Sequence, residues 1–187
     1  MLALEYCHNK KIIHRDIKFQ NILLAHHIET LPDNSSSGIK IKLCDFGIFG
    51  TNRGLSTEKS TAGSLKFMSP ELLTGKTGST PKIDVWSVGC MLHAMMLGYY
   101  PFDADDREGL KKQILTKQIK LTKTKQAATE GISEPCLDLI ERMLIKDPEK
   151  RISLIDIIHH PWQMSYKKSS LQNFDLSSIS SESLEKE

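Results

Sequence analysis

The stretch HRDIKFQN, residues 14–21, is followed at once by the apolar run Ile22-Leu23-Leu24. It holds two strong cations, a carboxylate and two carboxamides and has no regular apolar spacing, so we expect an irregular segment. The apolar run predicts a short strand. A second run, residues 39–43, predicts a partner strand, and the Ser- and Gly-containing residues 32–38 predict the polar loop between them.

The rest of the chain predicts helices. Residues 2–8 read as a helix that begins without an N-cap, as if the chain started inside an element. Residues 46–80 have little periodicity and predict a long functional loop. Thr80 as N-cap and Pro81 as the first helical residue precede the apolar run 85–97, which predicts a buried central helix. Further helices are predicted at 107–117, from Ser133, and from a capping box at Ser153 to an end at Pro161.

Composition excludes several classes of protein. The 187 residues suit one domain, and a net charge of +2 gives no reason to expect a nucleic-acid or membrane partner. The four cysteines form no CxxC pair, which favours free thiols in a reducing compartment. No apolar run approaches the roughly 20 residues of a membrane span. We therefore expect a protein of the cytoplasm or nucleus, with a domain at 1–162 and a Ser-rich disordered tail at 163–187.

Three further motifs follow the opening stretch in a fixed order. Asp45-Phe46-Gly47 comes directly after a predicted strand, Ser69-Pro70-Glu71 follows at the end of the long loop, and DVWSVG, residues 84–89, opens the central helix. Together with H-R-D-x-x-x-x-N at residues 14–21, this order resembles the eukaryotic protein kinases. The resemblance covers residues 1–162. It is strongest to the serine/threonine kinases of the calcium/calmodulin-dependent and AMP-activated group.

The resemblance implies a fold and an activity. The fold would be mainly α with a small β-hairpin, as in the C-terminal lobe of a protein kinase (α+β overall). The N-terminal lobe would be absent, since no G-x-G-x-x-G loop and no V-A-I-K lysine precede residue 14. The activity would be transfer of the γ-phosphoryl group of ATP, with Mg²⁺, to a serine or threonine of a protein substrate. An alternative is a truncated, pseudokinase-like binding module without catalysis, and a purely structural helical protein is disfavoured by the long loop.

The resemblance assigns the chemistry to a few residues. Asp16 would accept the proton of the substrate hydroxyl, and Lys18 would place a cation near the transferring phosphate. Asn21 and Asp45 offer the oxygen ligands that Mg²⁺ prefers. With Lys18 they would bind ATP, and Leu23 would lie beneath the adenine ring. A binding module has no need of all four polar residues, which favours the enzyme.

Other matched residues are expected to be structural. His14 and Phe46 resemble members of the packed column that aligns active kinases. Asp84 resembles the helix residue that binds the catalytic-loop backbone. Glu71 and Arg151 resemble a buried ion pair of the family. Two methionines of the central helix, Met91 and Met95, are expected in the core.

Regulation and substrate choice are also implied. Arg15 before the catalytic Asp resembles kinases that an upstream activating kinase switches on, and Ser60 stands at the phosphorylated position, with Thr57 and Thr61 as alternatives. The hydroxyl of Ser64 would contact the catalytic Asp and Lys and position the substrate. With Lys18, it favours serine/threonine over tyrosine specificity.

Two departures from the family concern substrate charge. Phe19-Gln20 stands where the family has Pro-Glu, and Ala94 stands at a second position that is acidic in members selecting arginine. A strong preference for basic substrates is therefore not expected.

The histidine pairs 26–27 and 159–160 have no ligands at metal-binding spacing, so we expect them to be solvated or to cap helices.

Overall fold

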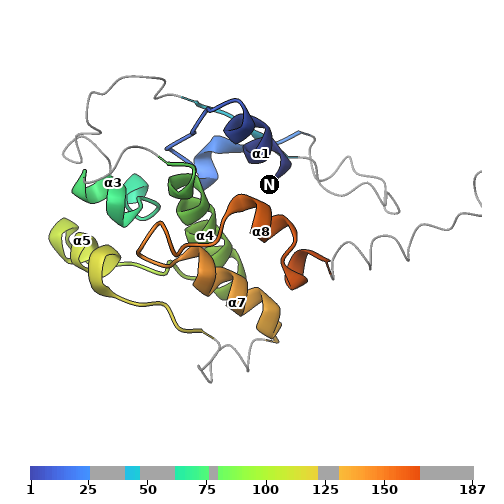
Figure 1. Cartoon of the computed structure of the whole chain (residues 1–187). Helices are drawn as coiled ribbons and strands as arrows, with labels where there is room; N and C mark the ends of the chain where they lie inside the picture. Colours follow the sequence, from blue (N-terminus) through green and yellow to red (C-terminus); the bar gives the residue numbers. More distant parts are fainter. Residues whose placement is uncertain (26–40, 47–61, 76–79, 122–130, 165–187) are drawn as a thin grey trace, which may run out of the picture.

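The structure is a computed structural model that describes residues 1–25, 41–46, 62–75, 80–121 and 131–164. Helix α4 (Lys82–Leu97) lies in the middle, and α1, α3, α5, α7 and α8 are arranged around it (Figure 1). Its residues are apolar on nearly all sides, and most are buried, with Trp86 and Cys90 fully so. The helix ends at Gly98, whose φ of 75° is easy only for glycine and whose N–H donates to the Ala94 carbonyl at 3.0 Å.

The start of α4 differs from the prediction by one residue. Pro81, not Thr80, occupies the N-cap position, and the hydroxyl of Thr80 has no hydrogen-bond partner among the described residues. Ile83 instead donates its N–H to the Thr80 carbonyl at 3.1 Å. The side-chain cap predicted at Thr80 is therefore wrong, although the helix itself is present.

The remaining long helices pack their apolar faces inward. In α5 (Arg107–Thr116) Asp106 accepts the Gly109 N–H at 2.7 Å, and Leu110 and Ile114 are buried. Helix α7 (Glu134–Met143) lies against α4 and buries Leu137 and Ile140. The remaining helices of this group are α1 (Leu2–Asn9) and α8 (Leu154–Ile158).

The capping box predicted for α8 is present. Ser153 Oγ accepts the Asp156 N–H at 3.2 Å and donates to the Asp156 carboxylate at 2.5 Å. The helix ends at Ile158, before Pro161, and a further helical turn runs over residues 161–164. Proline therefore begins a turn here, which its preset φ allows.

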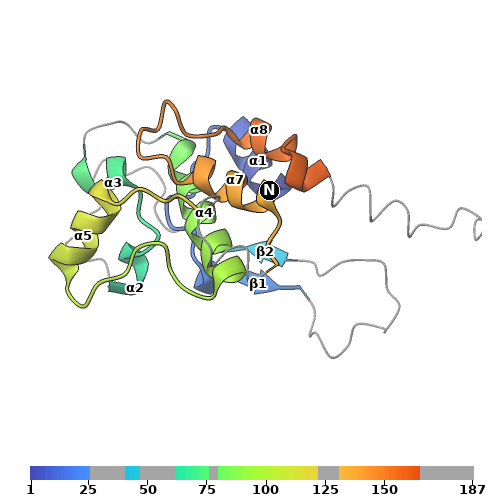
Figure 2. The same ribbon diagram turned by 90° about the horizontal axis from the view of Figure 1, so that it is seen from below.

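A small antiparallel hairpin accompanies the helices. A 3₁₀ turn, η1 (Phe19–Asn21), leads into β1 (Ile22–Leu24), which pairs with β2 (Ile41–Leu43) so that Ile22 faces Leu43. Figure 2 shows the two strands side by side at the edge of the helical body. The expected mainly helical fold with one hairpin is thus observed. No helix of the described part of the chain has the length and hydropathy of a membrane span.

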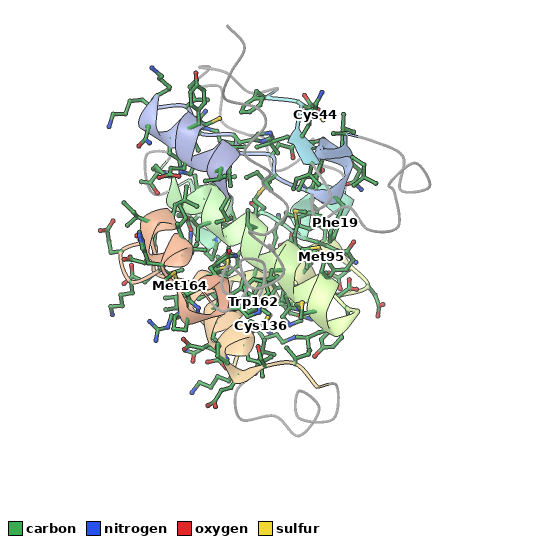
Figure 3. The ribbon with its side chains drawn as sticks, turned by 90° about the vertical axis from the view of Figure 1, so that its right-hand side faces the viewer. Phe19, Cys44, Met95, Cys136, Trp162 and Met164 are labelled. Carbon is green, nitrogen blue, oxygen red and sulfur yellow. The ribbon has the colours of Figure 1, made fainter. Side chains whose placement is uncertain are left out.

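Two expectations about packing were wrong. The loop predicted at 46–80 contains α2 (Ala62–Leu65) and α3 (Pro70–Thr74), and Leu65 and Phe67 are buried, so its described part is packed. Ser87 of α4 explains part of this, because its hydroxyl donates to the Phe67 carbonyl at 2.8 Å. Met91 lies in the core, but Met95 is 60% exposed because it points away from α7 near the end of the helix (Figure 3).

Candidate active site

The irregular segment at residues 14–21 is held by one buried carboxylate. Asp84, in the first turn of α4, accepts the His14 N–H at 2.9 Å and the Arg15 N–H at 2.8 Å. Arg15 has a φ of 67°, a conformation that costs a non-glycine residue about 1–3 kcal/mol. The two hydrogen bonds offset this cost. The segment therefore keeps its shape only while α4 is in place.

A residue that the sequence reasoning missed completes this contact. His8, at the end of α1, donates from Nε2 to Asp84 Oδ2 at 2.8 Å. It is nearly buried and joins α1 to α4 through Asp84. The only feature of the sequence that could have pointed to His8 was its position, six residues before His14 in the helix that precedes the motif. Periodicity does not single it out.

Four polar side chains meet in front of the segment. Lys18 Nζ lies 2.7 Å from Asp16 Oδ2 and 3.3 Å from Ser64 Oγ. Asn21 Nδ2 donates to the Asp16 carbonyl at 2.7 Å and to the Asp16 carboxylate at 3.1 Å. The side chains of Lys18 and Asp16 are 19% and 29% exposed, and an ion pair so close to solvent stabilises a fold by only about 0–1 kcal/mol. Fold stability is therefore a poor explanation for the cluster.

Asp45 is brought to the same place by the hairpin. The Cys44 N–H donates to the Asn21 carbonyl at 2.9 Å, so the end of β2 meets the start of β1 beside the cluster. Asp45 follows with a φ of 58° and is exposed. A carboxylate and a carboxamide are oxygen donors, as hard Mg²⁺ requires, and Mg²⁺ commonly takes only one or two ligands from protein. These two residues therefore fit a magnesium ion completed by phosphate and water.

His14 connects the hairpin to the segment. Its Nε2 donates to the Cys44 carbonyl at 3.0 Å, and its Nδ1 accepts the Asp16 N–H at 3.3 Å. These two bonds select the neutral tautomer with the proton on Nε2. The ring packs on Phe46, with centroids 4.6 Å apart and planes at 51°. His14 thereby links the backbone of Cys44, which precedes Asp45, to the backbone of Asp16.

The outer face of the hairpin is open. Leu23, expected beneath an adenine ring, is 50% exposed on β1, and the side chains of Leu24 and Ile41 are similarly open. Leu24 pairs with Ile41 and shares one side of the hairpin with it, whereas Leu23 pairs with Lys42 and lies on the opposite side. Leu23 therefore offers a single exposed apolar side chain next to the polar cluster.

The ion pair expected between Glu71 and Arg151 is present. Arg151 Nη1 and Nη2 donate to the two carboxylate oxygens of Glu71 at 2.6 and 2.9 Å. Both side chains are buried. The pair ties α3 to the chain segment before α8, and so anchors the described end of the loop that carries Ser64.

Some predicted features lie elsewhere. Gly47, Ser60, Thr57 and the histidine pair 26–27 fall outside the described residues. Arg15 Nε is buried without a hydrogen-bond partner among the described residues. His159 and His160 contact the Ile155 carbonyl and the Asp138 carboxylate, at 2.8 and 3.0 Å. In the described ranges no three His, Cys, Asp or Glu side chains gather as a metal cluster.

Comparison with known proteins agrees with the geometry. The family model described as "Protein kinase domain" matches residues 1–163. The chain is 38% identical to a carbon catabolite-derepressing protein kinase of Secale cereale over 86% of this chain and 28% of that protein. It is 34% identical to serine/threonine-protein kinase SIK1 of Mus musculus over 87% of this chain and 19% of that protein. Protein kinase kin1 of Schizosaccharomyces pombe is 35% identical, over 87% and 16%. The chain spans less than a third of the length of these curated relatives.

Proposed function

Because this chain belongs to the protein kinase family, we propose that it carries the phosphoryl-transfer residues of a protein serine/threonine kinase. The reaction is transfer of the γ-phosphoryl group of ATP to a serine or threonine hydroxyl of a protein substrate. The observation that carries the proposal is the position of Lys18 Nζ, between the carboxylate of Asp16 and the hydroxyl of Ser64. These contacts support the proposed roles of Asp16 as base, Lys18 as cation and Ser64 as substrate-positioning hydroxyl, because Lys18 bonds to both of the others.

Asp16 orients the acceptor and takes its proton. Its Oδ2 already accepts hydrogen bonds from Lys18 and Asn21, which hold the carboxylate in one orientation. When the hydroxyl oxygen bonds to the γ-phosphorus, the bond from that phosphorus to the ADP oxygen breaks and the proton passes to Asp16. Lys18 compensates charge on the transferring group, and Ser64 keeps Lys18 turned toward it.

Asn21 and Asp45 are the residues that would hold Mg²⁺. A bound ion of this kind neutralises the phosphate oxygens of the nucleotide and aligns them for transfer. The chain's own contribution is to keep the two ligands at the ends of β1 and β2, which the bond from Cys44 to Asn21 joins. The adenine would rest on Leu23 of the open hairpin face.

Replacing Asp16 tests the reaction. We expect Asp16→Asn to lower the rate of ATP-dependent peptide phosphorylation roughly 10²–10⁴-fold without changing the melting temperature by much. Asp105→Asn, an exposed residue outside the cluster, is the matched control and should keep the wild-type rate. A wild-type rate in the Asp16 variant would refute the assignment.

We also propose that these 187 residues act as the C-terminal lobe of the kinase and bind ATP–Mg²⁺ weakly by themselves. The exposed side chain of Leu23 supports this, since a surface that is open on one side buries little of a nucleotide. Calorimetric titration with ATP–Mg²⁺ should give a dissociation constant of about 1 mM or weaker. Micromolar binding would contradict the lobe assignment, and no binding at all would favour a non-catalytic module.

Activation by phosphorylation of Ser60 is a further part of the proposal. The buried, unpartnered Nε of Arg15 supports it, because a phosphate can supply the missing acceptor. An upstream kinase would introduce the phosphate. Phosphorylated protein, verified by mass spectrometry, should melt at a higher temperature than its Ser60→Ala variant treated in the same way. The gain should be lost in Arg15→Gln.

The remaining assignments stay proposals. They are a domain at 1–162 with a tail at 163–187, and a location in the cytoplasm or nucleus. Limited proteolysis that removes the tail and leaves residues 1–162 intact would test the first. Fluorescence microscopy of the tagged protein would test the second.

A further inference from the structure

Three aromatic side chains form a row that begins beside the cluster. Phe19 directly follows Lys18 and meets Phe67 edge to face, with ring centroids 5.8 Å apart and planes at 81°. Phe67 meets Tyr100 in the same way, at 5.7 Å and 84°. The Phe67 N–H also donates to the Ser64 carbonyl at 3.3 Å, which ties the row to the reacting groups. Phe19, Phe67 and Tyr100 are called the aromatic row below.

The aromatic row is rigid at its centre, open at the Phe19 end and half-buried at Tyr100. Phe67 is buried, and the hydroxyl of Ser87 holds its carbonyl. Phe19 is 36% exposed, and Tyr99, next to Tyr100, is 43% exposed. Figure 3 shows Phe19 and the exposed Met95 toward the same edge of the molecule. Single exposed apolar side chains are ordinary, but several together beside reacting groups mark a binding surface.

The charges along the aromatic row are compensated internally. Lys66 Nζ lies 2.7 Å from the Asp103 carboxylate and 4.5 Å from the centre of the Tyr100 ring. Asp103 is therefore not a free partner for a cation. Gln20 and Ala94, at the two positions noted in the sequence, are uncharged. Asp103 is paired with Lys66, and the two positions that are acidic in arginine-selecting members of the family carry no charge here.

Resting on the proposed function, we propose that the aromatic row selects the protein substrate. It favours an aromatic or large aliphatic side chain close to the acceptor serine or threonine and gives no advantage to arginine. An apolar side chain placed edge-on against Phe19 removes exposed ring surface from water. A guanidinium against these rings would lose hydration, and at the Tyr100 end of the row it would also meet the charge of Lys66.

Peptide scanning tests the selection. Serine peptides carrying Phe, Leu, Ala or Arg at each of several positions around the acceptor are phosphorylated by the full chain with ATP–Mg²⁺. We expect one position at which Phe or Leu raises kcat/KM at least about tenfold over Arg, equivalent to 1.4 kcal/mol. Selection of arginine over Phe and Leu, or no selection at any position, overturns the proposal.

Two variants separate the aromatic row from general effects. Phe19→Ala should reduce the preference for Phe over Ala peptides to less than about twofold. Lys66→Met frees Asp103 and should raise kcat/KM for the arginine peptides several-fold. Ile155→Ala, which removes an equally exposed apolar side chain on α8, should leave the preference unchanged. An unchanged preference in Phe19→Ala overturns the proposal.

Binding measurements distinguish this inference from the proposed function. The same peptides, labelled with a fluorophore, are titrated with the chain in the absence of ATP and followed by anisotropy. Apolar peptides should bind at least about tenfold more tightly than arginine peptides. If this order appears without any phosphorylation, the kinase assignment fails and the row remains a peptide-binding surface. If apolar peptides bind no better than the others, the row is not the selecting surface, whether or not phosphorylation occurs.

Discussion

Two cations in the interior, Arg151 and Lys146, differ in how their charges are compensated. All five donor groups of Arg151 are used: two bonds go to Glu71 and the others to the carbonyls of Ile145, Lys82 and Lys146. Lys146 Nζ is shielded from solvent and has no hydrogen-bond partner among the described residues. It lies instead over the rings of Phe102 and Trp86, at 4.0 and 4.9 Å. Removing these two side chains should therefore change the stability of the protein in opposite directions.

Removing Arg151 should destabilise the protein strongly. Arg151→Ala leaves the carboxylate of Glu71 buried and unpaired, and we expect the free energy of unfolding to fall by roughly 3–5 kcal/mol. Urea denaturation of purified protein measures the loss. Arg142→Ala removes a half-exposed arginine paired with Asp138 on α7 and should cost less than about 1 kcal/mol. An unchanged melting temperature in Arg151→Ala would show that the pair is unimportant.

Removing the charge of Lys146 should stabilise the protein. Burial lowers the pKa of Lys146 from 10.5 to about 8, so the charged form is disfavoured in the folded state. The resulting penalty is complete below pH 8 and disappears as the pH rises from 8 to 10.5. At pH 7 the free energy of unfolding of Lys146→Met should therefore exceed that of wild type by roughly 1–3 kcal/mol, after the lost contacts with the two rings and the screening by solvent are counted.

The pH dependence of this difference is its check. The advantage of Lys146→Met should shrink steadily between pH 8 and 10 as measured by urea denaturation. Lys150→Met, at an exposed lysine nearby, should show no such trend. An advantage that stays constant over this range would mean that the charge of Lys146 is not the cause.

At the scale of elements, the contact between α4 and α7 depends on a glycine. A Cβ added to Gly89 would lie 2.8 Å from Met143 Cβ and 3.1 Å from Leu144 Cδ2. Distances this short force the two helices apart. The absence of a side chain at position 89 therefore sets how closely the two helices approach.

Filling this position should loosen the core. Gly89→Ala should lower the free energy of unfolding by roughly 1–3 kcal/mol, even though alanine favours the helix by about 1 kcal/mol. At Gly63 in α2 the same added atom meets nothing within 4 Å among the described residues, so Gly63→Ala serves as the control. Thermal unfolding by circular dichroism compares the two. Equal melting temperatures would rule out the steric account.

Elements with strong local signals were predictable. The apolar run of α4, the helical spacing of α5 and the capping box at Ser153 each have a cause within a few residues. Helices α2 and α3 were missed because elements distant in sequence hold them: both contact α5, and Ser87 of α4 bonds to the carbonyl of Phe67, which lies between them in the chain. Met95 was misplaced because a helix that is apolar all round gives no sign of which side meets a neighbour.

The residues in and around the polar cluster could also be predicted only in part. The motif HRDIKFQN identified Asp16, Lys18 and Asn21, and the structure brings them together with Ser64. The role of His8 could not be predicted, because its contact with Asp84 joins residues that lie 76 positions apart. Ser60 remains a prediction from the motif pattern alone.

For the whole molecule, the open face of the hairpin matters most. Leu23 leaves an exposed apolar side chain beside the polar cluster, on a chain that spans less than a third of the length of its relatives. A net charge of +2 would give little long-range steering of the proposed ATP ligand. The affinity of the proposed nucleotide site would therefore depend on contacts made at Leu23 and the polar cluster.

The hydrogen bonds to Asp84 also make the loop a reporter of global stability. The amide hydrogens of His14 and Arg15 can exchange with solvent deuterium only when their bonds to this core carboxylate open. Their exchange should be as slow as that of the amides inside α4, although they belong to no helix or strand. Asp84→Asn should speed it at least about tenfold, and fast exchange in the wild type would show that the loop opens independently. A segment of irregular backbone would then share the lifetime of the most protected helix in the protein.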